Sequence, residues 1–426
     1  MSYEQLSKKS KRILENQLAT LFSSKALLNI TSISEVLKLK PFPPEIKYQG
    51  NSLFLSSHGI DGLTNIGGLI KRETSVCNDI LPDEINGFIL ENLEFWLNKN
   101  LRPNGEEFMV EFIRLAYKKV QNFKFLVPIT GMDLKDLNEL SIGAISIQRP
   151  DIEFFQKFQF GELLNEKLIY EQLSDSLWLT GCANGSPYKA RESFQHKTIL
   201  AVGILGIYGS ILYKGQIWQT RVNATISSFD NRKTATSISW VGTGENLSYS
   251  RSWGPEQDLP FTAESLAYLK ETCFLEQMGA LIDNPRPSEL DISILKSIYW
   301  FSEAYKDRNP IMQFTKLWVC AESFFSGDKE KIVSSNVKGI TAILLFAGFN
   351  VITPEQSKKT KKRIEDLYDL RSRALHQATF HEISNKDLCE LSHWIAWVII
   401  SMVALSQKGY KTNRQVMEQV ERLNHL

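Results

Sequence analysis

The segment Trp394–Leu405 is apolar on nearly every face of the helix that its sequence predicts. A helix that is apolar all round is a buried helix, because it has no polar face to give to water. We therefore expect the helix 385–407 to form the centre of a bundle. Five more helices are predicted in the same part of the chain: Ile292–Lys306, Pro310–Phe325, Ile332–Ala347, Pro354–Gln377 and Asn413–Asn424.

A break in regular structure is predicted at Asp283–Pro287, which holds two prolines and an asparagine. It divides the chain into residues 1–282 and residues 283–426. The first region mixes both kinds of element, with helices expected near residues 3–28, 81–96, 105–120, 198–212 and 263–282, and strands at 123–129 and 142–147. Alternating side chains at 218–226 and 234–240 predict a hairpin with one wet face. The expected fold is an α+β N-terminal region of helices and antiparallel strands, followed by an all-α bundle.

Composition narrows the class of protein. The 426 residues carry a formal net charge of only +1, which argues against coating nucleic acid by bulk electrostatics. Five cysteines without a CxxC pair indicate reduced thiols in a reducing compartment. No apolar segment follows the polar N-terminus Met1–Arg12, so no secretory signal is visible and a cytoplasmic location is expected. The apolar run Thr198–Tyr213 has 16 residues. That is short of the roughly 20 that a membrane span needs, so we expect a buried helix and no membrane.

An arginine interrupts the apolar stripe of the predicted helix Pro354–Gln377. Ile364, Leu367, Tyr368 and Ala374 define the stripe, and Arg371 lies in the middle of it. An uncompensated buried charge costs about 3–5 kcal/mol or more. Arg371 must therefore meet a carboxylate, a subunit interface or an anionic ligand.

The carboxylate proposed as its structural ion-pair partner is Glu322, on the predicted helix Pro310–Phe325. In that interpretation Arg371 only holds the bundle together. His376 follows Arg371 by five positions, and an unperturbed histidine has a pKa suited to proton transfer near neutral pH. Taken alone, such a histidine is more often an interfacial or capping residue near a helix C-terminus.

The spacing Arg371-x4-His376 resembles the R-x4-6-H motif of HEPN domains. Its surroundings, Leu367-Tyr368 and Arg371-Ser372 before His376, look most like the Apea-like HEPN branch. The segment Ala321–Phe325 is similar to that branch's upstream helix. The resemblance covers about residues 285–407, and Gln377 departs from the glycine often found after the histidine.

The resemblance implies an endoribonuclease that works without a metal or other cofactor, as a homodimer, often in antiphage defence or as a toxin. The RNA, for which tRNA is one candidate, supplies its own nucleophile, the 2′-hydroxyl. His376 would be the general base or acid, and Arg371 would neutralise the scissile phosphate. Ser372, about 40° around the helix from His376, could orient the imidazole or the phosphate. The alternative is a HEPN module that dimerises and binds RNA or nucleotide without cutting.

Helix geometry adds a condition to this hypothesis. Residues five apart lie about 140° around a helix axis, so Arg371 and His376 do not share a face. Two copies of the helix related by a twofold axis could bring both residues to one phosphate. A homodimer through the bundle is therefore expected.

Further substrate-binding candidates lie on the same predicted helix: Lys358, Lys359, Lys361, Lys362, Arg363, Asp369 and Arg373. Five of these cations stand near the helix start, where the macrodipole favours anions. Phosphate binding could justify their position, and a solvated face is the simpler interpretation. Cys389 and His393 have i,i+4 spacing, but two ligands do not make a metal site, and no metal is expected.

Overall fold

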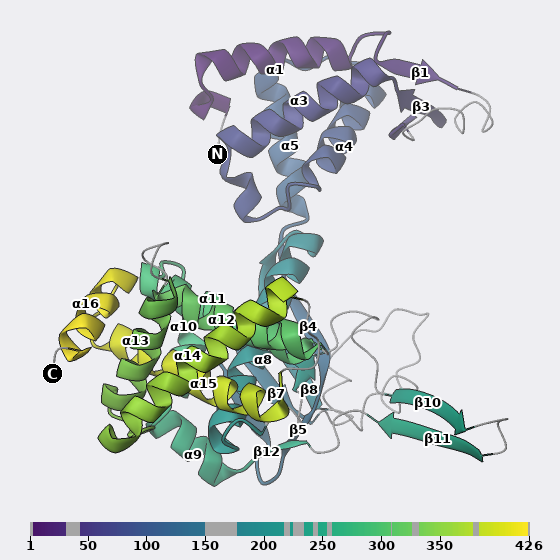
Figure 1. The fold of residues 1–426 in the computed structure, drawn as a ribbon. Coiled ribbons are helices and arrows are strands. Elements are labelled where there is room, and N and C mark those ends of the chain that lie inside the picture. Colours follow the sequence, from purple (N-terminus) through teal and green to yellow (C-terminus); the bar gives the residue numbers. More distant parts are fainter. Residues whose placement is uncertain are drawn as a thin grey trace. The chain divides into compact units, whose positions relative to one another are not determined.

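The computed structural model describes residues 3–30, 43–149, 177–216, 222–224, 234–241, 246–253, 258–307, 309–325, 332–377 and 383–424. It divides into two compact units (Figure 1). One unit comprises residues 1–125 and 182–194, and the other comprises residues 126–181 and 195–426. The boundary predicted between residues 282 and 283 falls inside the second unit, between α10 (Leu275–Ile282) and α11 (Glu289–Lys306).

The first unit packs helices beside a small antiparallel sheet. Its helices are η1 (Tyr3–Gln5), α1 (Lys8–Leu21), α3 (Ser57–Glu73), η2 (Ser75–Asn78), α4 (Ile85–Asn98) and α5 (Gly105–Lys118). Its strands β1 (Leu27–Asn29), β2 (Glu45–Tyr48) and β3 (Asn51–Leu55) pair in the order β1-β3-β2. The helix predicted over residues 3–28 is thus shorter than expected, because the chain turns after Leu21 into β1. The helix α3 and this sheet were not predicted.

Among the elements of this unit, α5 has the clearest start signal in the sequence. Asn104 caps it, since its side chain accepts a hydrogen bond from Glu107 N at 2.9 Å and Glu107 Oε2 accepts one from Asn104 N at 2.9 Å. This reciprocal capping box satisfies two of the free amides at the helix start. The buried face of α5 carries Phe108 and Phe112 into the core of the unit.

The second unit contains a five-stranded sheet in the order β6-β7-β8-β4-β9. The strands are β4 (Gln121–Thr130), β6 (Glu139–Ile142), β7 (Ile145–Gln148), β8 (Leu177–Gly185) and β9 (Asn223–Ala224). Two short strands, β5 (Met132–Leu134) and β12 (Leu259–Phe261), pair in parallel. The helices before the bundle are α8 (Pro187–Leu212), α9 (Ala263–Glu271) and α10. Three of these elements, β4, β8 and α8, carry the chain across the boundary between the two units.

Two predicted elements are each divided in the structure. The strand expected at 142–147 becomes β6 and β7, which are joined by a turn at Gly143 with φ of 59°. A Cβ atom at Gly143 would lie 2.5 Å from the carbonyl oxygen of Gly279 in α10, so this close approach requires glycine. The helix expected at 263–282 is broken at Phe274, whose φ is 57°.

The hairpin predicted between residues 218–226 and 234–240 is wrong, because its second strand pairs with another segment. β10 (Thr234–Val241) pairs antiparallel with β11 (Asn246–Trp253), with Thr234 opposite Trp253. In the earlier segment, Asn223–Ala224 pairs with β4 instead, and residues 217–221 and 225–233 lie outside the described residues. Period-two alternation shows which side chains share a face, but it does not specify the partner strand.

The bundle has the predicted helix order. It consists of α11, α12 (Pro310–Phe325), α13 (Ile332–Phe346), α14 (Pro354–Gln377), α15 (Asn385–Gln407) and α16 (Asn413–Asn424). α15 packs against α11, α12 and α13, which confirms its expected place at the centre. Among the described residues it is also the one helix long and apolar enough to cross a membrane, and 67% of its most apolar window is buried inside the fold. These two properties together are those of a core helix.

The apolar run after Lys197 is buried in the second unit, as expected. It forms the later part of α8, where residues from Leu200 to Ile211 are almost all buried. Gly203 lies against α11, since a Cβ atom there would stand 2.6 Å from the carbonyl oxygen of Ile298. The absence of a side chain at Gly203 therefore sets the distance between α8 and α11.

Candidate functional site

The helix α14 begins and packs as its sequence predicts. The amide of Thr353 donates to Gln356 Oε1 at 3.0 Å, which gives the predicted start of the helix one half of a capping box. Ile364, Leu367 and Ala374 are buried against the bundle. Arg371 lies among them at the edge of the buried face, with 19% of its side chain exposed.

Arg371 is paired within its own chain. Its Nη2 lies 3.2 Å from Glu322 Oε1 on α12 and donates to Glu322 Oε2 at 3.4 Å. Its Nη1 donates to the hydroxyl of Tyr368 at 3.2 Å, and that hydroxyl donates to Glu322 Oε1 at 3.2 Å. The ion pair proposed from sequence is present, and a tyrosine closes it into a triad.

Aromatic packing fixes the position of this triad. The ring of Trp318, one helical turn before Glu322, meets the ring of Tyr368 edge-on with 4.8 Å between centroids. The Arg371 guanidinium lies 5.4 Å from the Tyr368 ring centroid, within the range of a cation–π interaction. The pKa of Tyr368 is raised by burial and by the Glu322 carboxylate, and Arg371 partly opposes this rise. The tyrosine therefore stays a hydrogen-bond donor over the physiological range.

The guanidinium is not fully satisfied in this arrangement. Arg371 Nε is buried and has no hydrogen-bond partner among the described residues. A planar guanidinium has five N–H donors, and here Nη1 and Nη2 make all the hydrogen bonds seen. Nε is therefore an unsatisfied donor inside the bundle, and only the exposed part of the guanidinium faces solvent.

The other predicted catalytic and binding residues of the helix C-terminal half lie elsewhere on α14. Asp369, Ser372 and Arg373 are exposed. His376 is within the helix, but its side chain lies outside the described residues. Tyr368 was predicted only as part of the apolar stripe. Its hydroxyl, three residues before Arg371, was the available signal for a polar role.

The cationic run at the start of α14 separates into two groups. Lys358, Lys359, Lys361 and Lys362 are exposed, and Lys362 lies 3.1 Å from Asp366. Arg363 instead points to α15, where it pairs with Asp387 and, at 2.7 Å, with Glu390. Arg363 therefore joins α14 to α15, which its assignment as a substrate-binding residue did not anticipate.

A groove of about 450 Å³ adjoins the triad, between α11, α12 and α16. The residues that line it are Glu289, Ile292, Ser293, Lys296, Val319, Glu322, Ser323 and Asn413. Asn413 donates to Ser293 Oγ and to the carbonyl oxygen of Ser323, both at 3.0 Å, while its own Oδ1 has no partner among the described residues. Glu322 belongs both to the groove and to the Arg371 ion pair.

The cysteine–histidine pair of α15 serves the packing of the second unit. His393 Nδ1 lies 3.0 Å from the carbonyl oxygen of Ser210 on α8, and burial lowers the pKa of His393. No group of three potential ligands among histidine, cysteine, aspartate and glutamate occurs within the described ranges.

Comparison with known proteins adds no relative. No family model, no curated protein and no solved structure matches the chain. The family resemblance of the helical bundle therefore depends on the motif residues around Arg371 and on the helix order alone.

Proposed function

We propose that this protein is a HEPN-type endoribonuclease of the Apea-like branch, which cleaves RNA such as tRNA by attack of the RNA 2′-hydroxyl. The proposal includes a cytoplasmic location and a role in antiphage defence or as a toxin. The observation that carries the proposal is the Arg371 guanidinium, which is partly exposed and pairs with the Glu322 carboxylate. Arg371 stands five residues before His376, and an anionic ligand could take the place of that carboxylate.

A phosphate group can replace Glu322 in this arrangement. Carboxylate and phosphate oxygens are both acceptors for a guanidinium fork, and phosphate carries more charge. The Arg371 side chain is 19% exposed, so a phosphate would approach the guanidinium from its solvent-facing side. In the reaction, the guanidinium would stabilise the charge that builds up on the phosphorane.

The proposed reaction needs one proton acceptor and one proton donor. The 2′-oxygen forms a bond to phosphorus as its proton passes to His376, and the bond from phosphorus to the 5′-oxygen breaks. The leaving oxygen takes a proton from the imidazolium of the partner copy or of the same copy. The products are a 2′,3′-cyclic phosphate and a 5′-hydroxyl end, and no water or metal enters the balance of this step.

The active form would be a homodimer. Positions five residues apart on a helix differ by about 140° around its axis, so one helix would not place Arg371 and His376 on one phosphate. A twofold axis near the exposed residues Ser372 and Arg373 would bring the two helices together there.

The groove beside Glu322 is the proposed place for a nucleoside next to the scissile phosphate. Lys296 and Glu289 offset each other in charge, as Arg371 and Glu322 do, so the groove is polar and near neutral. Such a surface suits the hydroxyls of a ribose and the edges of a base better than a second phosphate.

The second candidate function is a HEPN module that dimerises and binds RNA or nucleotide without cutting. The Glu322–Arg371 ion pair favours it, because the arginine already has an anionic partner. Buried or half-buried ion pairs of this kind are common structural features of helical bundles.

Cleavage of total RNA and of tRNA by the full-length protein in EDTA separates the two candidates. The ribonuclease hypothesis requires cleavage by the wild type, products whose 3′ ends resist phosphatase until acid opens the cyclic phosphate, and loss of activity in His376→Ala and Arg371→Ala. His58→Ala is the matched control, since His58 is an exposed histidine of the first unit. Equal cleavage by wild type and His376→Ala would remove His376 from the mechanism. RNA binding without cleavage in all proteins would favour the second candidate.

A further inference from the structure

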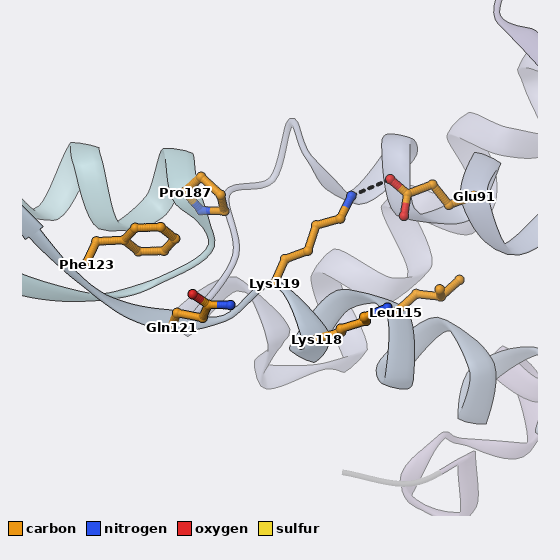
Figure 2. Close-up of a pocket in the computed structure, with 7 residues that line it drawn as sticks. All are labelled: Glu91, Leu115, Lys118, Lys119, Gln121, Phe123 and Pro187. Atoms are coloured by element: carbon orange, nitrogen blue, oxygen red, sulfur yellow. Dashed lines mark hydrogen bonds and ion pairs between the residues drawn. The ribbon is translucent and has the colours of Figure 1, made fainter. Parts of the chain in front are cut away.

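The first unit contains a cavity of about 380 Å³ at the C-terminal end of α5. Figure 2 shows the seven residues that line it: Glu91, Leu115, Lys118, Lys119, Gln121, Phe123 and Pro187. Its walls are mainly apolar, with charged and amide groups at the rim. The volume is within the range of about 300–1,000 Å³ that small-molecule sites occupy.

A row of aromatic rings ends at this cavity, and its last ring, Phe123, lines the wall. Phe125 stacks on Phe194 with 4.6 Å between ring centroids, and Phe123 follows Phe125 at 6.4 Å. Gln121, Phe123 and Phe125 alternate along β4 and therefore share one face of the strand. Phe123 is the last ring of the row, and it lies beside Pro187 at the cavity (Figure 2).

The two lysines of the rim differ in their partners. Lys119 Nζ lies 2.5 Å from Glu91 Oε1 and 5.1 Å from the centroid of the Phe88 ring, so its charge is already neutralised. Lys118 is exposed and has no ion-pair partner among the described residues. The cavity therefore has a net charge of about +1 at its rim, from one free ammonium group.

The helix macrodipole explains only part of this arrangement. Cations are favoured in the last turn of a helix, and both lysines stand at the end of α5. The macrodipole does not account for the open apolar cavity beside Lys118. It also does not explain why the Phe123 ring and the exposed amide of Gln121, both on β4, line that cavity. A ligand with a flat apolar body and an anionic group matches all of these features.

We propose that this cavity binds a nucleoside monophosphate unit. The base packs on the Phe123 ring and Pro187, the amide of Gln121 hydrogen-bonds to the base or ribose, and the phosphate pairs with Lys118. Stacking of a base on an aromatic side chain tolerates any base, so the expected specificity is for the phosphate more than for the base. The unit is either a free mononucleotide or the terminal nucleotide of an RNA strand. The proposal does not depend on the ribonuclease hypothesis.

Calorimetric titration of the full-length protein tests the ligand class. AMP and UMP are expected to bind, and adenosine and inorganic phosphate are each expected to bind about tenfold more weakly than AMP, because each retains only one of the two contacts. A trinucleotide with a 5′-phosphate separates the two sources, since tighter binding than AMP assigns the site to the end of a strand. No binding of AMP and UMP at millimolar concentration overturns the proposal, as does phosphate that binds as tightly as AMP.

Variants locate the binding. Lys118→Gln should lower the affinity for AMP by about tenfold and leave the affinity for adenosine unchanged. Phe123→Leu should lower the affinity for both ligands. Lys124→Gln is the matched control, because Lys124 is exposed on the opposite face of the same strand, and it should change neither. Unchanged circular dichroism and thermal midpoints verify folding.

Photo-crosslinking provides an independent location. 8-Azido-AMP should label peptides that contain Phe123 or Pro187, and labelling confined to the helical bundle would contradict the assignment. Retained binding of AMP by the Lys118→Gln and Phe123→Leu variants would also overturn it.

Discussion

The carboxylate of Glu322 lies 3.2 Å from the guanidinium of Arg371, across the interface between α12 and α14. The two residues are 49 positions apart in the chain. The hydroxyl of Tyr368 bridges them, and about a fifth of each charged side chain is exposed. The pair is thus shielded enough to hold the helices together and open enough for a solute anion to compete.

Removal of the pair measures its contribution to stability. Arg371→Ala and Glu322→Ala should each destabilise the second unit, and a double-mutant cycle should give a coupling free energy of about 1–2 kcal/mol. The measurement is chemical unfolding followed by the fluorescence of the tryptophans in the bundle. Tyr368→Phe should lower the coupling, because the bridging hydroxyl is lost. Additive effects of the two alanine substitutions would show that the ion pair contributes nothing.

Glycine positions in α8 should respond oppositely to alanine. Gly203→Ala places a methyl group 2.6 Å from the Ile298 carbonyl oxygen and should cost about 1–3 kcal/mol through the displacement of α11. Gly206→Ala meets nothing closer than the Phe301 ring at 3.6 Å and should stabilise the helix by about 0.5–1 kcal/mol. Thermal midpoints of the two variants and the wild type provide the comparison. A Gly203→Ala protein as stable as Gly206→Ala would disprove the close approach of the helices.

Acid should weaken the contact between α14 and α15. Burial acts to raise the pKa of Asp387, but hydrogen bonds from Ser384 and the guanidinium of Arg363 outweigh it, and the pKa is lowered from its ordinary value of 3.8. A carboxylate with a lowered pKa in the folded state contributes stability that is complete above its ordinary pKa and is lost as the pH falls toward the folded value.

The Asp387→Asn variant tests this dependence. Thermal midpoints measured between about pH 6 and pH 3 should fall less steeply with acid in the variant than in the wild type, because one titrating group is gone. Asp366→Asn is the control and should leave the slope unchanged, since Asp366 is exposed on α14 and its one ion-pair partner among the described residues is Lys362 on the same helix. Parallel slopes for the wild type and Asp387→Asn would contradict the assigned role of Asp387.

Thiol reactivity should divide the cysteines by burial. Cys182 is exposed and should react first with an aromatic disulfide reagent. Cys273 and Cys320 are buried, and burial raises the pKa of Cys273 to about 11, so both should stay protected until the protein unfolds. Mass spectrometry of timed samples identifies the labelled peptides, and Cys182→Ser should remove the fastest phase. Rapid labelling of Cys320 in the native protein would show that the bundle core is open.

The bundle was the most predictable part of the chain. α12, α14, α15 and α16 have the bounds that the sequence indicates, because strong start signals and helical periodicity coincide there. The N-cap at Ser384 is an example, since its side chain and that of Asp387 form a reciprocal capping box. The partner of Arg371 could be proposed as well, because a stripe arginine demands an anion and Glu322 lay on an adjacent helix.

The remaining features of the fold and of the site depend on contacts between distant residues, which the order of residues in the sequence does not reveal. β10 pairs with β11, and the alternation of side chains at 218–226 gave the wrong partner because alternation does not specify which strand lies alongside. The turn at Gly143 follows from the approach of α10 to the sheet. The engagement of Arg363 with Asp387 and Glu390 arises from the packing of two long helices, and in the sequence that arginine was one of five adjacent cations.

Glu322 is shared by the groove and the Arg371 triad, and this sharing makes the two sites thermodynamically linked. A molecule in the groove that hydrogen-bonds to the Glu322 carboxylate would weaken the ion pair between Glu322 and Arg371. The affinity of Arg371 for an anion would then increase. Reciprocity then requires an anion on Arg371 to strengthen groove binding by the same factor. Two parts of one RNA could in this way bind cooperatively without any movement of the helices.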